Sequence, residues 1–166
     1  MKFFYNILMG AALISGMMPV STASAQSTYE EHKKEIETAI SIIDLEKREI
    51  VNFNMNLSKE EESKFWTLYN EYRLAMNVVG KRKAKLITDY ADSFKNKNLS
   101  DSEALRIIKE FFSIEHSKLT RREEYISKFQ EVLPPKKVFL FFQIENKFEA
   151  EINYHLARNI PGINKF

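Results

Sequence analysis

Once its first 25 residues are set aside, the chain has very few residues that interrupt helices. The remainder contains only two glycines and three prolines, namely Gly80, Gly162, Pro134, Pro135 and Pro161. Glycine and proline are the main residues of tight turns, so a fold of many short strands would need more of them. Abundant Glu, Lys, Leu and Ala favour helices instead. The sequence therefore predicts an all-α protein built from long helices.

The first 25 residues have the pattern of a secretory signal peptide. Lys2 supplies a positive charge, residues 7–18 are mostly apolar, and Ala23-Ser24-Ala25 is a small-residue cleavage site. The alternative is a retained membrane helix, but this apolar segment is too short to cross roughly 30 Å of hydrocarbon comfortably. We therefore expect residues 1–25 to be removed on export.

The remaining chain, residues 26–166, has a size that suits one domain. It contains no cysteine, so it has no disulfide bonds. The whole chain carries 25 Lys and Arg against 23 Asp and Glu, whereas a nucleic-acid-binding domain has a strong basic excess. No later apolar stretch approaches the length of a membrane span. We expect a single all-helical domain with no nucleic-acid partner and no stable membrane insertion after cleavage.

Apolar residues recur every three or four positions along four segments, which is the spacing of amphipathic helices. We expect helices over about 29–52, 58–95, 100–132 and 134–159. The asparagine cluster at 52–56 is expected to end the first helix, because Asn favours turns and caps.

Two of the expected helices begin with the pattern of a capping box. In this motif a Ser side chain accepts a hydrogen bond from the backbone three residues on, and a Glu at that position reaches back. Ser58 with Glu61 and Ser100 with Glu103 have this spacing, each with Leu just before the Ser. These pairs predict where the second and third helices start.

The stretch LPPKKVFLFFQIENKFEAEI at 133–152 has three possible interpretations. A strand would account for 138–142 but not for the charged residues from Glu145 onward. A membrane span would need about 20 apolar residues, and this run is far shorter. Proline is well tolerated in the first helical turn, and the apolar residues continue at helical spacing. We therefore expect the fourth helix to start at the two prolines.

Three charged residues fall on otherwise apolar sides of the expected helices. Glu115 and Arg122 lie between apolar residues of the third helix, and Glu145 lies within the apolar stripe of the fourth. If the two helices pack antiparallel, an Arg122–Glu145 or Arg122–Glu115 pair would sit in the seam. A structural ion pair that fixes register is the main interpretation. A ligand or proton site is the alternative.

The residues of common catalytic and metal sites are not assembled in the sequence. There is no cysteine nucleophile, phosphate-binding glycine loop or H-E-x-x-H motif. The three histidines, His32, His116 and His155, lie on three different expected helices, while zinc favours about four close ligands. We predict neither an enzyme nor a metal or cofactor site.

Aromatic residues are abundant, and long thin hairpins have little interior to hold them. Part of this apolar surface is therefore expected to be covered by a second subunit or left for other proteins. The expected contact surface combines aromatic residues with the basic run in the middle of the second helix. Its residues are Phe65, Trp66, Tyr69, Tyr72, Lys81, Arg82 and Lys85.

The motif Leu57-Ser58-Lys59-Glu60-Glu61 in an exported, cysteine-free helical chain resembles the Spy/CpxP family of periplasmic proteins, which has two LTxxQ motifs. The second motif would correspond to Leu133-Pro134-Pro135-Lys136-Lys137. The resemblance implies four helices in elongated antiparallel hairpins, a periplasmic location and a cradle-shaped homodimer. It also implies binding of unfolded proteins without ATP, or restraint of a sensor kinase in an envelope-stress pathway.

We therefore expect an ATP-independent periplasmic chaperone or envelope-stress accessory protein. The alternative is a regulatory partner of the periplasmic domain of a membrane sensor, which could respond to metal. An enzyme is the third interpretation, and a cavity gathering Glu115, Arg122, Glu145 and a histidine would favour it.

Overall fold

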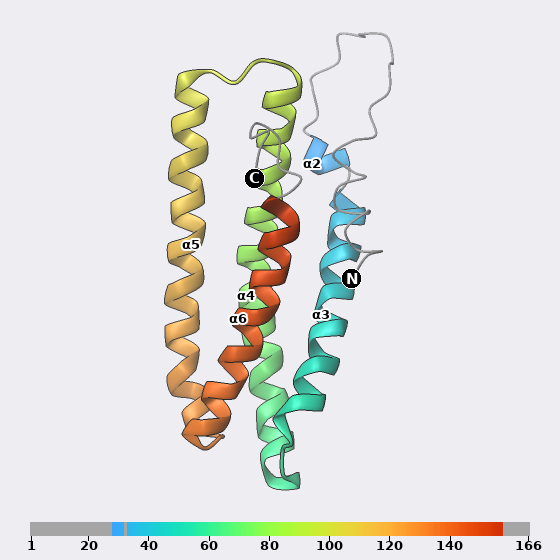
Figure 1. Cartoon of the computed structure of the whole chain (residues 1–166), viewed down its shortest axis with the longest axis vertical. Coiled ribbons are helices and arrows are strands. Elements are labelled where there is room, and N and C mark those ends of the chain that lie inside the picture. Colours follow the sequence, from blue (N-terminus) through green and yellow to red (C-terminus); the bar gives the residue numbers. More distant parts are fainter. Residues whose placement is uncertain (1–27, 32, 158–166) are drawn as a thin grey trace.

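The computed structural model describes residues 28–31 and 33–157, and almost all of them are helical (Figure 1). One turn, α2 (Thr28–Glu31), precedes four long helices. These are α3 (Lys33–Met55), α4 (Lys59–Lys95), α5 (Asp101–Gln130) and α6 (Pro135–Ala157). The part of the chain that the structure describes contains no strand, which confirms the all-α prediction. The expected signal peptide lies outside the described residues.

The helices form an elongated bundle in which each one runs antiparallel to the next along the chain (Figure 1). The hairpin of α4 and α5 has the most extensive contacts, α3 lies on the other side of α4, and α6 packs against α3 and α5. This arrangement is consistent with the elongated hairpins expected from the sequence.

The observed helix starts agree with the capping signals. At α4 the backbone N–H of Glu61 donates to Ser58 Oγ at 3.3 Å, and the backbone N–H of Ser58 donates to Glu61 Oε2 at 2.8 Å. At α5 the N–H of Glu103 donates to Ser100 Oγ at 3.2 Å. The Glu103 carboxylate accepts instead from Arg106, so the second predicted box is only half formed.

Two helix ends lie two or three residues from the predicted positions, and the first of them falls within the asparagine cluster that was expected to end it. The first long helix continues beyond Asn52 to Met55, because Val51 and Met55 are buried in the core. Asn56 then takes a φ of 42°, a left-handed conformation that Asn tolerates and that ends the helix. Helix α5 ends at Gln130, slightly before the predicted Val132.

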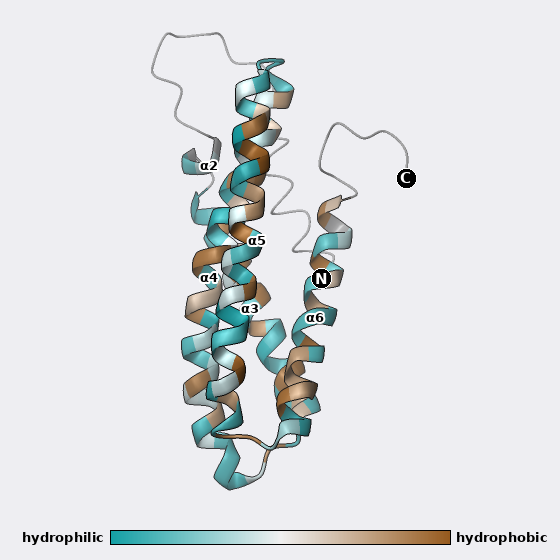
Figure 2. Cartoon of the chain, turned by 90° about the vertical axis from the view of Figure 1, so that its left-hand side faces the viewer, coloured by the Kyte–Doolittle hydropathy of each residue, from teal (hydrophilic) through white to brown (hydrophobic). Residues whose placement is uncertain are grey.

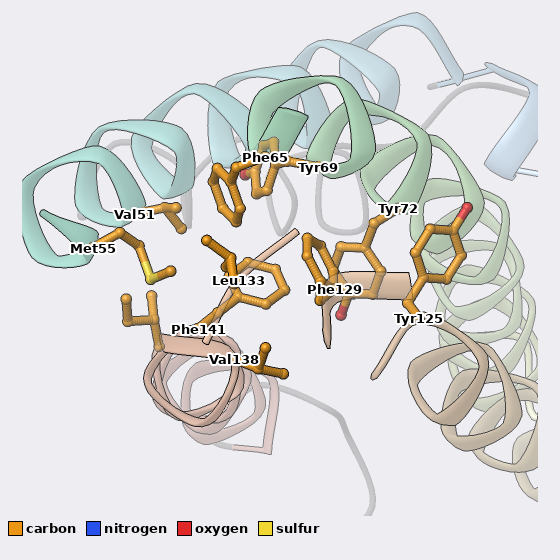
Figure 3. Packing of buried hydrophobic residues seen from close by; sticks show 11 residues of the cluster. Val51, Met55, Phe65, Tyr69, Tyr72, Tyr125, Phe129, Leu133, Val138 and Phe141 are labelled. Atoms are coloured by element: carbon orange, nitrogen blue, oxygen red, sulfur yellow. The ribbon is translucent and has the colours of Figure 1, made fainter. Parts of the chain in front are cut away.

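The core is concentrated at the end of the bundle where α5 turns into α6. Aromatic rings from α4, α5 and α6 meet there, and the ring centres of Phe129 and Phe141 are 4.6 Å apart (Figure 3). Leu133 from the connecting turn and Val51 from α3 join the same cluster. A second, smaller cluster of buried residues further along the bundle contains Val79, Leu86 and Ile114.

Candidate functional site

The aromatic residues expected to contact clients are mostly buried, which corrects the sequence-based assignment. Phe65, Tyr69 and Tyr72 have at most 1% of their surface exposed, because their spacing places them on the core-facing side of α4 (Figure 3). Trp66 is half-buried, and its ring lies 4.2 Å from the guanidinium carbon of Arg48. The first three side chains stabilise the fold and cannot form a contact surface.

The three basic residues of the predicted surface form ion pairs within the protein. Lys81 Nζ lies 2.8 Å from Glu37 Oε1 on α3, and Arg82 Nη2 lies 2.9 Å from Glu110 Oε1 on α5. Lys85 pairs with Asp89 one turn along α4. Lys81 and Arg82 therefore tie α4 to its two neighbours.

The predicted polar seam exists, but its partners differ from those expected. Arg122 pairs with Glu149, with Nη1 3.0 Å from Oε2, and also donates to Asn146. Glu145 is bound instead by Lys47 of α3, 3.2 Å from its Oε1, and by the hydroxyl of Tyr72. Because the helices set this register, neither of the two expected Arg122 pairs forms.

Lys118 and Glu149 complete the seam between α5 and α6, and sequence reasoning did not single them out. The Lys118 ammonium contacts the carboxylates of both Glu115 and Glu149. Burial alone would raise the pKa of Glu149, but the hydrogen bond and charge of Lys118 and the charge of Arg122 lower it overall. Lys118 and Glu149 lie one helical turn from Glu115 and Glu145, and this spacing could have identified them from the sequence.

A row of large apolar side chains runs along an uncovered face of α5. We call it the α5 apolar stripe, and it consists of Leu105, Ile108, Phe112, Leu119 and Ile126. Each side chain has between 39% and 65% of its surface exposed. Their steps of three, four and seven residues place them within one narrow arc of the helix. The structure thus contains a row of apolar side chains on α5 that the other described residues leave exposed.

The stripe is open because α5 contacts α4 and α6 through other arcs of its surface. Helix α5 packs on α4 through a different arc, which includes Ile107, Ile114 and Tyr125. Helix α6 begins beside the end of α5 but diverges from it toward its own C-terminal end (Figure 2). The expectation that slender hairpins leave apolar surface uncovered agrees with this arrangement.

The described residues contain neither a metal-binding cluster nor a helix suited to crossing a membrane. No three of their His, Asp or Glu side chains gather closely enough to hold a metal ion. His116 is exposed on α5, whereas His32 and the side chain of His155 lie outside the described residues. None of the described helices combines the length and apolar character needed to cross a membrane.

Comparisons of the chain with protein-family models, curated proteins and solved structures gave no match.

Proposed function

We propose that this protein binds exposed apolar segments of other proteins through the α5 apolar stripe, without ATP. It would act as a periplasmic chaperone or envelope-stress accessory of the kind implied by the Spy/CpxP resemblance. The observation that carries this proposal is the row of five large apolar side chains left exposed on one face of α5. Contiguous apolar patches of several hundred Å² on soluble proteins usually mark interaction sites.

The chemistry around the stripe fits loosely specified protein segments. Charged and polar side chains of both signs lie beside it, including exposed Lys109, His116 and Glu123. A flat apolar strip with a mixed-charge edge can bury apolar client residues while leaving client charges hydrated. Such binding gains free energy mainly from buried apolar area, so it needs no nucleotide.

The test is suppression of client aggregation by the purified protein and by a variant that lacks the stripe. In this variant Phe112→Ser, Leu119→Ser and Ile126→Ser remove three exposed apolar side chains. The matched control makes Leu45→Ser, Leu74→Ser and Val78→Ser, which are similarly exposed on α3 and α4. Light scattering of reduced lysozyme without ATP should be suppressed by the wild type and the control, and several-fold less by the stripe variant.

Two results would contradict the proposal. The first is no suppression by the wild type at several-fold excess, and the second is equal activity of the stripe variant and the wild type. A regulatory partner of a sensor would instead give one defined complex in a pull-down from envelope extracts, with little effect on generic clients.

A second copy of the chain is a competing occupant of the stripe, because the stripe is nearly self-complementary. In an antiparallel pair of α5 helices centred on His116, Phe112 lies within one residue of the position opposite Leu119, and Ile108 lies within two residues of the position opposite Ile126. Lys109 then faces Glu123, because each is seven residues from the centre. Both are exposed, and neither forms an ion pair with another described residue. This pattern favours an isologous homodimer, in which both copies use the same surface.

A further inference from the structure

A cavity of about 200 Å³ lies among α3, α4, α5 and α6, away from the α5 apolar stripe. Most of its wall is apolar, formed by Ile40, Val79, Ile87, Phe148, Ile152 and Leu156. Helical bundles commonly hold ligands in such interior spaces between facing helices. An apolar cavity of about 150 Å³ can hold a benzene molecule, so this one has room for an aliphatic chain of on the order of eight carbons.

The polar part of the cavity wall contains Lys83, which forms only a long ion pair. Lys83 Nζ donates to the neutral amide oxygen of Asn153 at 2.8 Å, whereas the nearest carboxylate oxygen, on Glu115, is 3.8 Å away. That carboxylate is already bonded to Lys118. Burial lowers the pKa of Lys83, although Glu115 and Glu149 oppose the effect. A half-buried cation whose close hydrogen bond goes to a neutral amide, and whose ion pair is long, favours an anionic ligand.

The cavity wall carries four cations and four carboxylates, but one carboxylate, Asp44, pairs with Arg73 outside the wall. Of the other charged groups on the wall, Lys47 pairs with Glu145. On the side of the cavity that faces α5 and α6, three cations lie near two carboxylates. The cations are Lys83, Lys118 and Arg122, and the carboxylates are Glu115 and Glu149. Lys83 therefore shares the Glu115 carboxylate with Lys118 at the edge of an apolar space.

We propose that this cavity binds an anionic amphiphile, with its aliphatic chain among the apolar residues and its carboxylate on Lys83. The ligand class is a free medium-chain carboxylate of about eight carbons, because the cavity volume accommodates a chain of that length. The carboxylate would complete the ion pairs of Lys83 and would replace the neutral contact with Asn153.

Calorimetric titration of the full protein with octanoate, below its micelle concentration, tests this site. Octanamide is the matched uncharged ligand. We expect octanoate to bind at least about tenfold more tightly than octanamide, because a charge-assisted hydrogen bond is worth that much. Lys83→Gln should abolish the preference, whereas Lys81→Gln, two residues away and paired with Glu37, should keep it. Val79→Phe, which fills the cavity, should weaken both ligands, with circular dichroism confirming the fold.

The pH dependence provides a second readout of the same contact. Because the Lys83 pKa lies below its ordinary value of 10.5, the octanoate preference should decline as pH rises through that lowered pKa. A titration in which neither ligand binds would overturn the proposal. Equal binding of the two ligands by the wild type, or an unchanged preference in Lys83→Gln, would also overturn it. None of these outcomes depends on the α5 apolar stripe, so they leave the proposed function to its own test.

Discussion

Glu145 shows how one buried charge is accommodated in an otherwise apolar face. It has 4% of its surface exposed and lies among apolar residues of α6. The sequence marked it as unusual, but its partners, Lys47 and Tyr72, come from α3 and α4. Both donors bond to Oε2, whereas Oε1 has no hydrogen-bond partner among the described residues and is stabilised by the charge of Lys47. Periodicity along one helix predicts an unusual position but cannot identify partners on other helices.

Replacing Tyr72 or Tyr69 with Phe should show which of the two hydroxyl groups contributes to the stability of the fold. Tyr72 Oη donates to Glu145 Oε2 at 2.9 Å, whereas Tyr69 Oη has no hydrogen-bond partner among the described residues. Both changes keep the buried ring. We expect Tyr72→Phe to lower the free energy of unfolding by about 1–3 kcal/mol, because it removes a donor from a buried charge.

Tyr69→Phe is the matched control and should change stability by less than about 0.5 kcal/mol or raise it slightly, since no bond is lost. Urea denaturation at pH 7 measures both variants. Equal destabilisation by the two changes would show that the Tyr72–Glu145 bond contributes nothing of its own.

Among the helical elements, the start of α4 is held more strongly than the start of α5. The Ser58 box is reciprocal, and Lys137 of α6 also contacts the Glu61 carboxylate and the backbone oxygen of Asn56. At α5 only the hydroxyl of Ser100 caps the backbone. The same sequence pattern therefore has different structural roles at the two sites.

This difference predicts unequal effects of removing the two caps. Ser58→Ala should cost about 1–2 kcal/mol of unfolding free energy, because it also loosens the Glu61 contact with α6. Ser100→Ala should cost about 0.5–1 kcal/mol, the range of a simple cap. Urea denaturation monitored by circular dichroism measures both. A larger loss for Ser100→Ala would contradict the structural role given to the Ser58 box.

Helix positions were largely predictable from the sequence, whereas the buried side of α5 was not. Capping residues and prolines act locally, so they predicted the starts of α4, α5 and α6. On α5, however, apolar residues occupy two neighbouring arcs, one with Leu105, Phe112 and Leu119 and another with Ile107 and Ile114. Only the second meets α4. Which arc is covered depends on the packing of other helices, which the local pattern does not contain.

At the scale of the whole molecule, packing is dense at one end and sparse at the other. The aromatic cluster joins α3, α4, α5 and α6 near the turn at Leu133. Beyond it α5 and α6 diverge (Figure 2), and the next cluster of buried residues, around Val79, is smaller. The α5 apolar stripe lies on another arc than the residues that contact α4 and α6, and the cavity lies among the same four helices. Both candidate sites thus lie outside the aromatic cluster.

Self-association through the stripe should depend on the pairing of Lys109 with Glu123 across the two copies. In light scattering, we expect the purified protein to shift toward twice the monomer mass as concentration rises. Lys109→Glu or Glu123→Lys alone should weaken the dimer by on the order of tenfold, because each places like charges opposite one another twice. The double variant reverses both charges and should restore dimerisation, whereas Lys64→Glu, exposed on α4, should have no effect.

Because clients and a second copy would use the same side chains, chaperone activity per protomer should fall as the protein concentration rises through the dimer dissociation constant. The two single charge variants, which remain monomeric to higher concentration, should keep their activity over that range. Aggregation assays at a fixed ratio of protein to client measure this dependence. A strictly monomeric protein, or a double variant as weak as the single ones, would exclude the antiparallel pairing. Activity per protomer that stays constant while the dimer forms would show that clients bind elsewhere.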